Sequence, residues 1–88
     1  MLEKYTIRTA FGVITNIRSD EDGSLYITNE NNREVKMSDK NKRWFRQIPE
    51  VKEKCIGYKG RKVDIITSQT TKNWKPAEYF CDVVLIIE

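Results

Sequence analysis

Residues 5–17 read YTIRTAFGVITNI, and this stretch decides the fold class. Apolar or β-branched side chains occupy alternate positions along it, which is the two-residue period of a β-strand. The stretch is long for one strand, and Gly12 lies in its middle, where a glycine suits a bulge or a sharp bend. The chain is therefore expected to open with one long, bent strand.

Two further strands are expected directly after the first. The segment 20–23 reads DEDG and predicts a turn, because aspartate tolerates turn geometry and glycine accepts a positive φ. Residues 25–28 resume the alternation, and a second turn at 29–32 leads into a strand over 33–37. The first third of the chain is therefore expected to form a three-stranded antiparallel meander.

A helical region is expected next. Ser38 suits the cap of a helix over residues 39–47, because its hydroxyl can accept from the free amides of the first turn. Pro49 would end this helix and could begin a further turn, which the following glycines would close. The apolar side chains expected to face inward are those of Trp44, Phe45, Ile48, Val51 and Cys55.

Two last strands complete the chain. Residues 62–67 alternate, residues 80–87 form an apolar run rich in β-branched side chains, and a polar loop over 68–78 separates them. The expected fold class is therefore mainly β, with the order β-β-β-α-β-β in a single domain over residues 1–88.

This order resembles the OB-fold, a five-stranded Greek-key barrel. The resemblance rests on the long glycine-containing first strand, on the one helical region between the third and fourth strands, and on the long last loop. It implies a barrel plugged by that helical region, with ligand bound across the second and third strands and between the loops at 19–24 and 68–78. An SH3-like barrel is the alternative, but its connections are usually shorter than residues 38–62.

Positive charge is concentrated in one segment. Lys40–Lys62 holds nine Lys/Arg and two Glu, a net charge of +7, while the remainder holds seven Lys/Arg and eleven Asp/Glu, a net charge of −4. A basic element on a mildly acidic body is typical of a protein that binds a polyanion. The first acidic turn, at residues 20–22, would repel a phosphate backbone and counts against nucleic acid at that rim of the groove.

The best candidate site lies in the last loop, where an aromatic side chain stands between cations. Single-stranded nucleic acid suits this mixture, because a base stacks on an indole for about 1–3 kcal/mol while lysines neutralise phosphates. The alternative is that the indole folds back over the end of the barrel. The loop residues expected to bind are Lys72, Asn73, Trp74 and Lys75.

Two further groups of residues are candidates. Tyr26 and Lys36 should share the outer face of the second and third strands, although an exposed tyrosine on a strand is also common for its β-propensity alone. The helical region carries a secondary basic patch, which could equally be a solvated face or meet a different partner. Its residues are Lys40, Lys42, Arg43 and Arg46.

Several classes of function find no support in the sequence. The chain has no histidine, no phosphate-cradling glycine loop and no paired ligand spacing, so we expect no enzyme, no cofactor and no metal. Cys55 and Cys81 lie far apart and are expected to be buried thiols. The amino terminus lacks the apolar core of a signal peptide and no apolar run could span a membrane, so a cytoplasmic protein is expected.

The sequence therefore predicts a small binder of single-stranded DNA or RNA. The alternative is a protein-interaction module, either a small regulatory factor or a subunit of an assembly or homo-oligomer, that uses the 80–87 strand. That strand is apolar on both of its faces, whereas a barrel strand needs only one such face.

Overall fold

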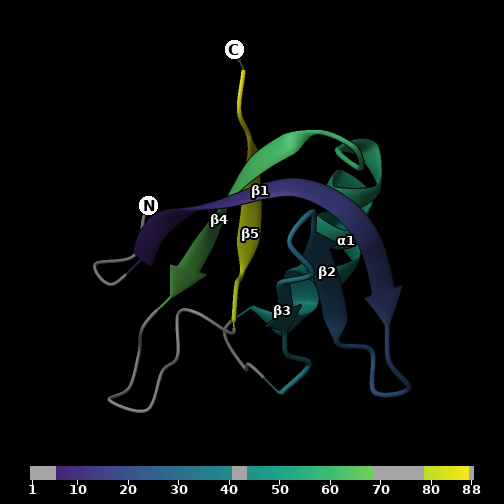
Figure 1. Cartoon of the computed structure of the whole chain (residues 1–88). Coiled ribbons are helices and arrows are strands. Elements are labelled where there is room, and N and C mark those ends of the chain that lie inside the picture. Colours follow the sequence, from purple (N-terminus) through teal and green to yellow (C-terminus); the bar gives the residue numbers. More distant parts are fainter. Residues whose placement is uncertain (1–5, 41–43, 69–78, 88) are drawn as a thin grey trace.

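A computed structural model describes residues 6–40, 44–68 and 79–87 (Figure 1). Five antiparallel strands form one sheet in the order β3-β2-β1-β4-β5. The strands are β1 (Thr6–Ser19), β2 (Leu25–Asn29), β3 (Glu34–Met37), β4 (Lys62–Ser68) and β5 (Asp82–Leu85), and a 3-10 helix η1 (Phe45–Gln47) and a helix α1 (Ile48–Gly57) lie between β3 and β4. The expected mainly β class, with one helical region after the third strand, is confirmed.

Strand β1 is the centre of the sheet and arches over it (Figure 1). Its first half pairs with β4 and its second half pairs with β2, and the register shifts between Ala10 and Gly12. Gly12 has a φ of +115°, and the next amide, that of Val13, donates to the Glu30 carboxylate at 3.0 and 3.2 Å. The expected glycine bulge is therefore confirmed, and a carboxylate from the β2–β3 turn stabilises it.

A second register shift, between Ile14 and Asn16, was not expected from the sequence. The two shifts together change which side chains face inward, because each extra residue in a strand reverses the alternation that follows it. Ile14 is fully buried, while Thr15 is exposed and donates its hydroxyl to the carbonyl oxygens of Thr28 and Asn29. The regular alternation expected over residues 5–17 is therefore wrong between Phe11 and Ile17, because Phe11 and Ile14 are both buried.

The helix expected over 39–47 is also wrong. Within the described part of that range, residues 39 and 40 form a turn, in which the Ser38 hydroxyl accepts from the Lys40 amide at 3.1 Å, and only Phe45–Gln47 is helical. Helix α1 begins at Ile48 and carries Pro49 in its first turn, where the missing amide of proline costs no hydrogen bond. Pro49 therefore lies in the first turn of α1, which ends at Gly57, and the further turn expected after Pro49 is confirmed.

The core lies between the sheet and α1. Phe80, Leu25 and Ile65 are among its largest fully buried side chains, and α1 contributes Ile48, Val51 and Cys55. Trp44 packs against this core, but Phe45 is 40% exposed, so its predicted place in the plug is wrong. The 3-10 turn places Phe45 on the outside because its rotation per residue differs from that of the expected α-helix.

The two ends of the sheet approach each other without forming a ladder. A single parallel bridge joins Lys36 of β3 to Tyr79, and the Phe80 amide donates to the Lys36 carbonyl at 3.0 Å. Over the described residues the sheet is not closed. No helix in this part of the chain is long and apolar enough to cross a membrane.

Cys55 and Cys81 are both free and buried, as expected. Burial in the apolar interior raises the pKa of each thiol to about 12. Both thiols are therefore protonated at neutral pH, and neither has the thiolate character of a nucleophilic cysteine.

Candidate nucleic-acid interface

A row of alternating cations and aromatic rings crosses the outer face of the sheet. The register places Arg18 of β1 opposite Tyr26 of β2, and Tyr26 opposite Lys36 of β3. The bridge to Tyr79 extends the row beyond β3. The residues on both sides of Tyr26 and of Lys36 are buried, Phe80 next to Tyr79 is buried, and Ile17 next to Arg18 packs against the core, so the row points outward. We call Arg18, Tyr26, Lys36 and Tyr79 the outer row.

The ring of Tyr26 lies between the two cations. The guanidinium carbon of Arg18 lies 3.8 Å from the ring centroid, and the ammonium nitrogen of Lys36 lies 5.3 Å from it. Both are cation–π distances. The Tyr26 hydroxyl donates to the Asp20 carboxylate at 3.0 Å. A base that binds here would therefore meet the ring together with Arg18, rather than a bare aromatic face.

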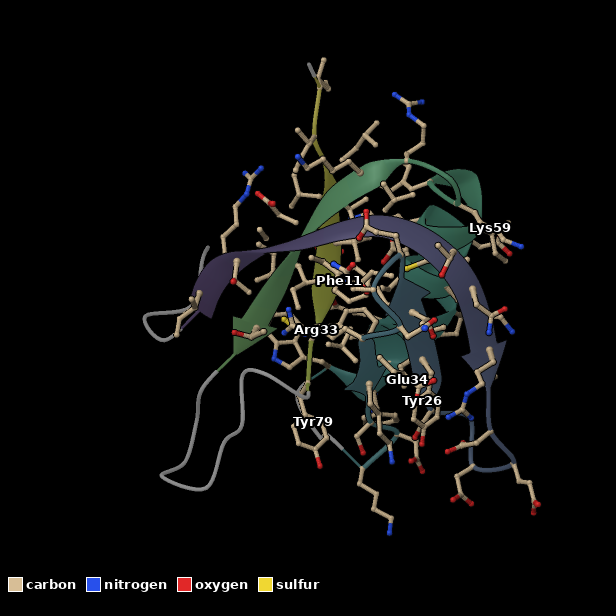
Figure 2. The ribbon with its side chains drawn as sticks, viewed as in Figure 1. Phe11, Tyr26, Arg33, Glu34, Lys59 and Tyr79 are labelled. Carbon is tan, nitrogen blue, oxygen red and sulfur yellow. The ribbon has the colours of Figure 1, made fainter. Side chains whose placement is uncertain are left out.

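Arg18 is also paired with a carboxylate. Its Nε and Nη2 donate to the two oxygens of Glu34 at 3.1 and 3.0 Å, and Figure 2 shows Glu34 beside Tyr26. The hydrogen bond to Glu34 raises the pKa of Arg18. Interaction with the Tyr26 hydroxyl is the main cause that raises the pKa of Lys36. Both cations of the outer row are therefore fully charged at neutral pH.

Asp20 is held by its own turn. One carboxylate oxygen accepts from the amides of Asp22 and Ser24, each at 3.0 Å, and the other accepts from Tyr26. Burial of the carboxylate opposes its ionisation, but these hydrogen bonds outweigh it and the pKa of Asp20 is lowered. The carboxylates of Asp20 and Glu34 thus balance the two cations of the outer row.

The remaining predicted site residues are mostly untested by the structure. Trp74 and its neighbours Lys72, Asn73 and Lys75 lie outside the described residues, as do Lys42 and Arg43 of the basic patch. Lys40 and Arg46 are exposed, and the Arg46 guanidinium lies 5.7 Å from the ring of Phe45. The structure therefore brings Tyr26 and Lys36 together and leaves the loop as a prediction.

Sequence reasoning missed Arg18 and Tyr79. The alternation held a signal for each. Ile17 and Phe80 are apolar and are expected to face inward, so their neighbours Arg18 and Tyr79 are expected to face outward. What the sequence does not contain is the cross-strand register that places both residues in line with Tyr26.

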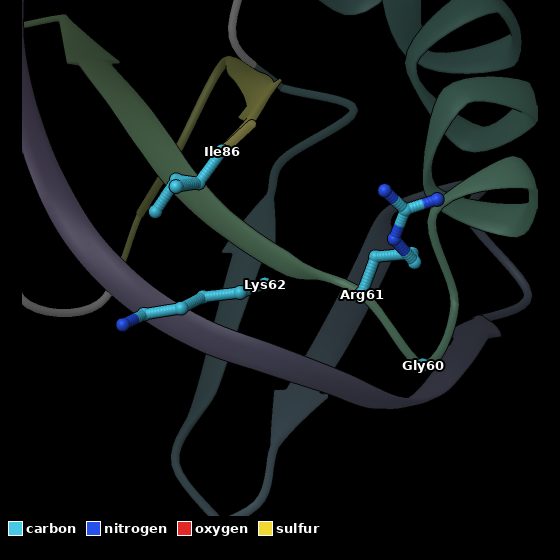
Figure 3. Close-up of a pocket in the computed structure, with 4 residues that line it drawn as sticks. All are labelled: Gly60, Arg61, Lys62 and Ile86. Atoms are coloured by element: carbon cyan, nitrogen blue, oxygen red, sulfur yellow. The ribbon is translucent and has the colours of Figure 1, made fainter. Parts of the chain in front are cut away.

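The end of the basic segment lies apart from the outer row. In Figure 2, Lys59 lies above Tyr26 and Glu34 and is separated from them. A shallow pocket of about 300 Å³ nearby is lined by Gly60, Arg61, Lys62 and Ile86, and Figure 3 shows the two cationic side chains pointing away from each other. These two cations do not converge on one anion.

Within the described ranges, no group of three or more side chains could hold a metal ion. Comparison of the chain with models of protein families, with curated proteins and with solved structures gives no match.

Proposed function

We propose that the protein is a small, non-catalytic binder of single-stranded nucleic acid. The observation that carries the proposal is the outer row, in which Arg18 and Lys36 flank Tyr26 on one continuous sheet surface. Alternating cations and rings suit a strand whose phosphates and bases also alternate. The net charge of +3 favours association with a polyanion.

The proposed architecture is an OB-like barrel. The strand order, with the β3 and β5 ends brought together by the Lys36–Tyr79 bridge, supports this proposal. The resembled fold binds its ligands across the second and third strands, which here carry Tyr26 and Lys36. Tyr79 is also the first described residue after the loop, so the proposed loop contacts would continue the outer row. These contacts are those of Lys72, Asn73, Trp74 and Lys75.

Titration with a fluorescently labelled oligothymidine and with its RNA counterpart tests the function. We expect binding at low salt, with an association constant that falls steeply as salt rises because bound phosphates release counterions. Fluorescence anisotropy at two salt concentrations measures both quantities. Absence of binding at the lower salt would refute the proposal.

The cytoplasm is the proposed location, because both free thiols are compatible with a reducing compartment.

A second candidate function is self-association through the 80–87 segment. Strand β5 stands at the end of the sheet order, and Ile87 beyond it is 87% exposed. The Asp82 carboxylate accepts from the Val83 amide at 2.8 Å and also pairs with Lys54, which protects the start of this edge. The apolar carboxyl-terminal part is where a second copy of the chain would pair.

Light scattering tests this second candidate. We expect the wild-type protein to show the mass of a dimer at high concentration, and we expect Ile87→Asp to remain a monomer because a buried aspartate has no partner at the pairing surface. A wild-type protein that stays monomeric throughout the concentration range would contradict the candidate.

A further inference from the structure

The pairing of Arg18 with Glu34 suggests how the outer row meets its ligand. We propose that Arg18, resting on Tyr26, is a binding position for a phosphodiester group, and that in the free protein the Glu34 carboxylate occupies this position. The inference rests on the proposed function and adds to it the chemistry of one contact. Glu34 then acts as an intramolecular competitor that the ligand must displace.

The geometry of the Arg18 side chain fits a phosphate. Two of its nitrogens, Nε and Nη2, each donate to a different oxygen of Glu34, at 3.1 and 3.0 Å. A phosphodiester offers two non-bridging oxygens that a guanidinium binds with the same fork. The Tyr26 ring, 3.8 Å from the guanidinium carbon, fixes the plane of the fork in advance. A phosphate could therefore replace the carboxylate with little movement of Arg18.

Glu34 is able to leave. Its side chain is 39% exposed and that of Arg18 is 48% exposed, and ion pairs as accessible as this one contribute little to stability. A released Glu34 side chain would enter water rather than the interior. The register places Glu34 opposite Thr28, in the row beside the outer row, so rotation about its side-chain bonds would suffice to clear Arg18.

The Arg18–Glu34 pair would favour binding of a polynucleotide over binding of a single phosphate ion. Lys36 lies on the other side of Tyr26, with its ammonium nitrogen 5.3 Å from the ring centroid. A polynucleotide could bind Lys36 and Arg18 together, whereas an isolated ion would have to displace Glu34 through one contact alone. Glu34 would therefore reduce binding of small anions more than binding of a polynucleotide.

The variant Glu34→Gln tests the inference, with Asp64→Asn as its matched control. Asp64 is paired with Arg8 at 2.7 Å on the β1–β4 half of the sheet, so both variants remove one carboxylate from an arginine pair. We expect Glu34→Gln to bind oligothymidine about three- to tenfold more tightly, with a similar salt slope because Arg18 contacts one phosphate in both proteins. Asp64→Asn should change affinity by less than about twofold, because salt screens distant charges.

Two further measurements make the result decisive. In an Arg18→Gln background, Glu34→Gln should improve binding no more than Asp64→Asn does. Without the Arg18 guanidinium, the Glu34 carboxylate has no phosphate position to occupy. Inorganic phosphate, followed through the Arg18 Nε resonance by NMR, should shift that resonance more in Glu34→Gln than in the wild-type protein.

The outcomes separate this inference from the proposed function. If the oligonucleotide binds and the two carboxylate variants behave alike, the inference is overturned and the function stands. If no variant binds the oligonucleotide, the proposed function is refuted, and the phosphate titration alone tests whether Arg18 is an anion-binding position. A larger shift in Glu34→Gln would then support the anion position, and equal or absent shifts would overturn it.

Discussion

Replacing Arg18 and Lys36 together by glutamate is expected to weaken oligothymidine binding by about a hundredfold or more at low salt. The double variant removes both cations that flank Tyr26 and puts negative charge where phosphates would lie. The loss should shrink as salt rises, because added ions screen the repulsion. Fluorescence anisotropy at several salt concentrations measures the affinity, and circular dichroism checks that the variant is folded.

The control for this result is Lys59→Glu with Arg61→Glu. Each double variant replaces two positive charges by two negative ones, so each changes the net charge from +3 to −1, that is 3 − 4 = −1. Both control residues are exposed, and Figure 2 shows Lys59 apart from Tyr26. We expect the control to lose affinity by only a few-fold. Equal losses would show that the outer row is no specific interface and that only the overall charge matters.

Gly12→Ala is expected to lower the free energy of unfolding by about 2–4 kcal/mol. The φ of +115° is unfavourable for any residue with a Cβ, at a cost of about 1–2 kcal/mol. A Cβ at this position would also collide with the Glu30 carboxylate and disturb its hydrogen bond from the Val13 amide. Denaturation by urea, followed by circular dichroism, measures the loss.

Gly23→Ala is the matched control for the bulge. Gly23 has a φ of +91°, and no described atom lies within 4 Å of the position that its Cβ would take, so this variant reports backbone strain alone. We expect Gly12→Ala to be the more damaging substitution, and we expect the difference to narrow when Glu30 is also replaced by alanine. Equal losses for the two glycines would mean that the contact with Glu30 does not contribute.

The strands could be predicted from the sequence because their signals are local. Alternation and turn residues mark β1 to β4, and Gly12 marks the first bulge. No glycine in the sequence marks the second bulge, after Ile14. The helix expected over 39–47 was misplaced, although the further turn expected after Pro49 matches α1, because Pro49 is compatible with either the end or the start of a helix. Burial of Val51 and Cys55 selects the start.

The candidate site was predictable only within single strands. Tyr26 and Lys36 follow from the alternation of β2 and β3, whereas Arg18 joins them through the β1–β2 register. That register depends on where the second bulge falls, which is a result of three-dimensional packing. The pairing of Glu34 with Arg18 depends on the same register and could not be anticipated. The loop residue Trp74 remains a prediction.

The two buried thiols give the chain its own reporters of local opening. A thiol reagent can modify a buried cysteine only while the surrounding structure is open, so its rate of modification measures how often that opening occurs. Cys55 reports on α1, and Cys81 reports on the residues that lead into β5. Different rates at the two positions would reveal that the helix and the carboxyl-terminal strand open independently, whereas identical rates would reveal one cooperative unit.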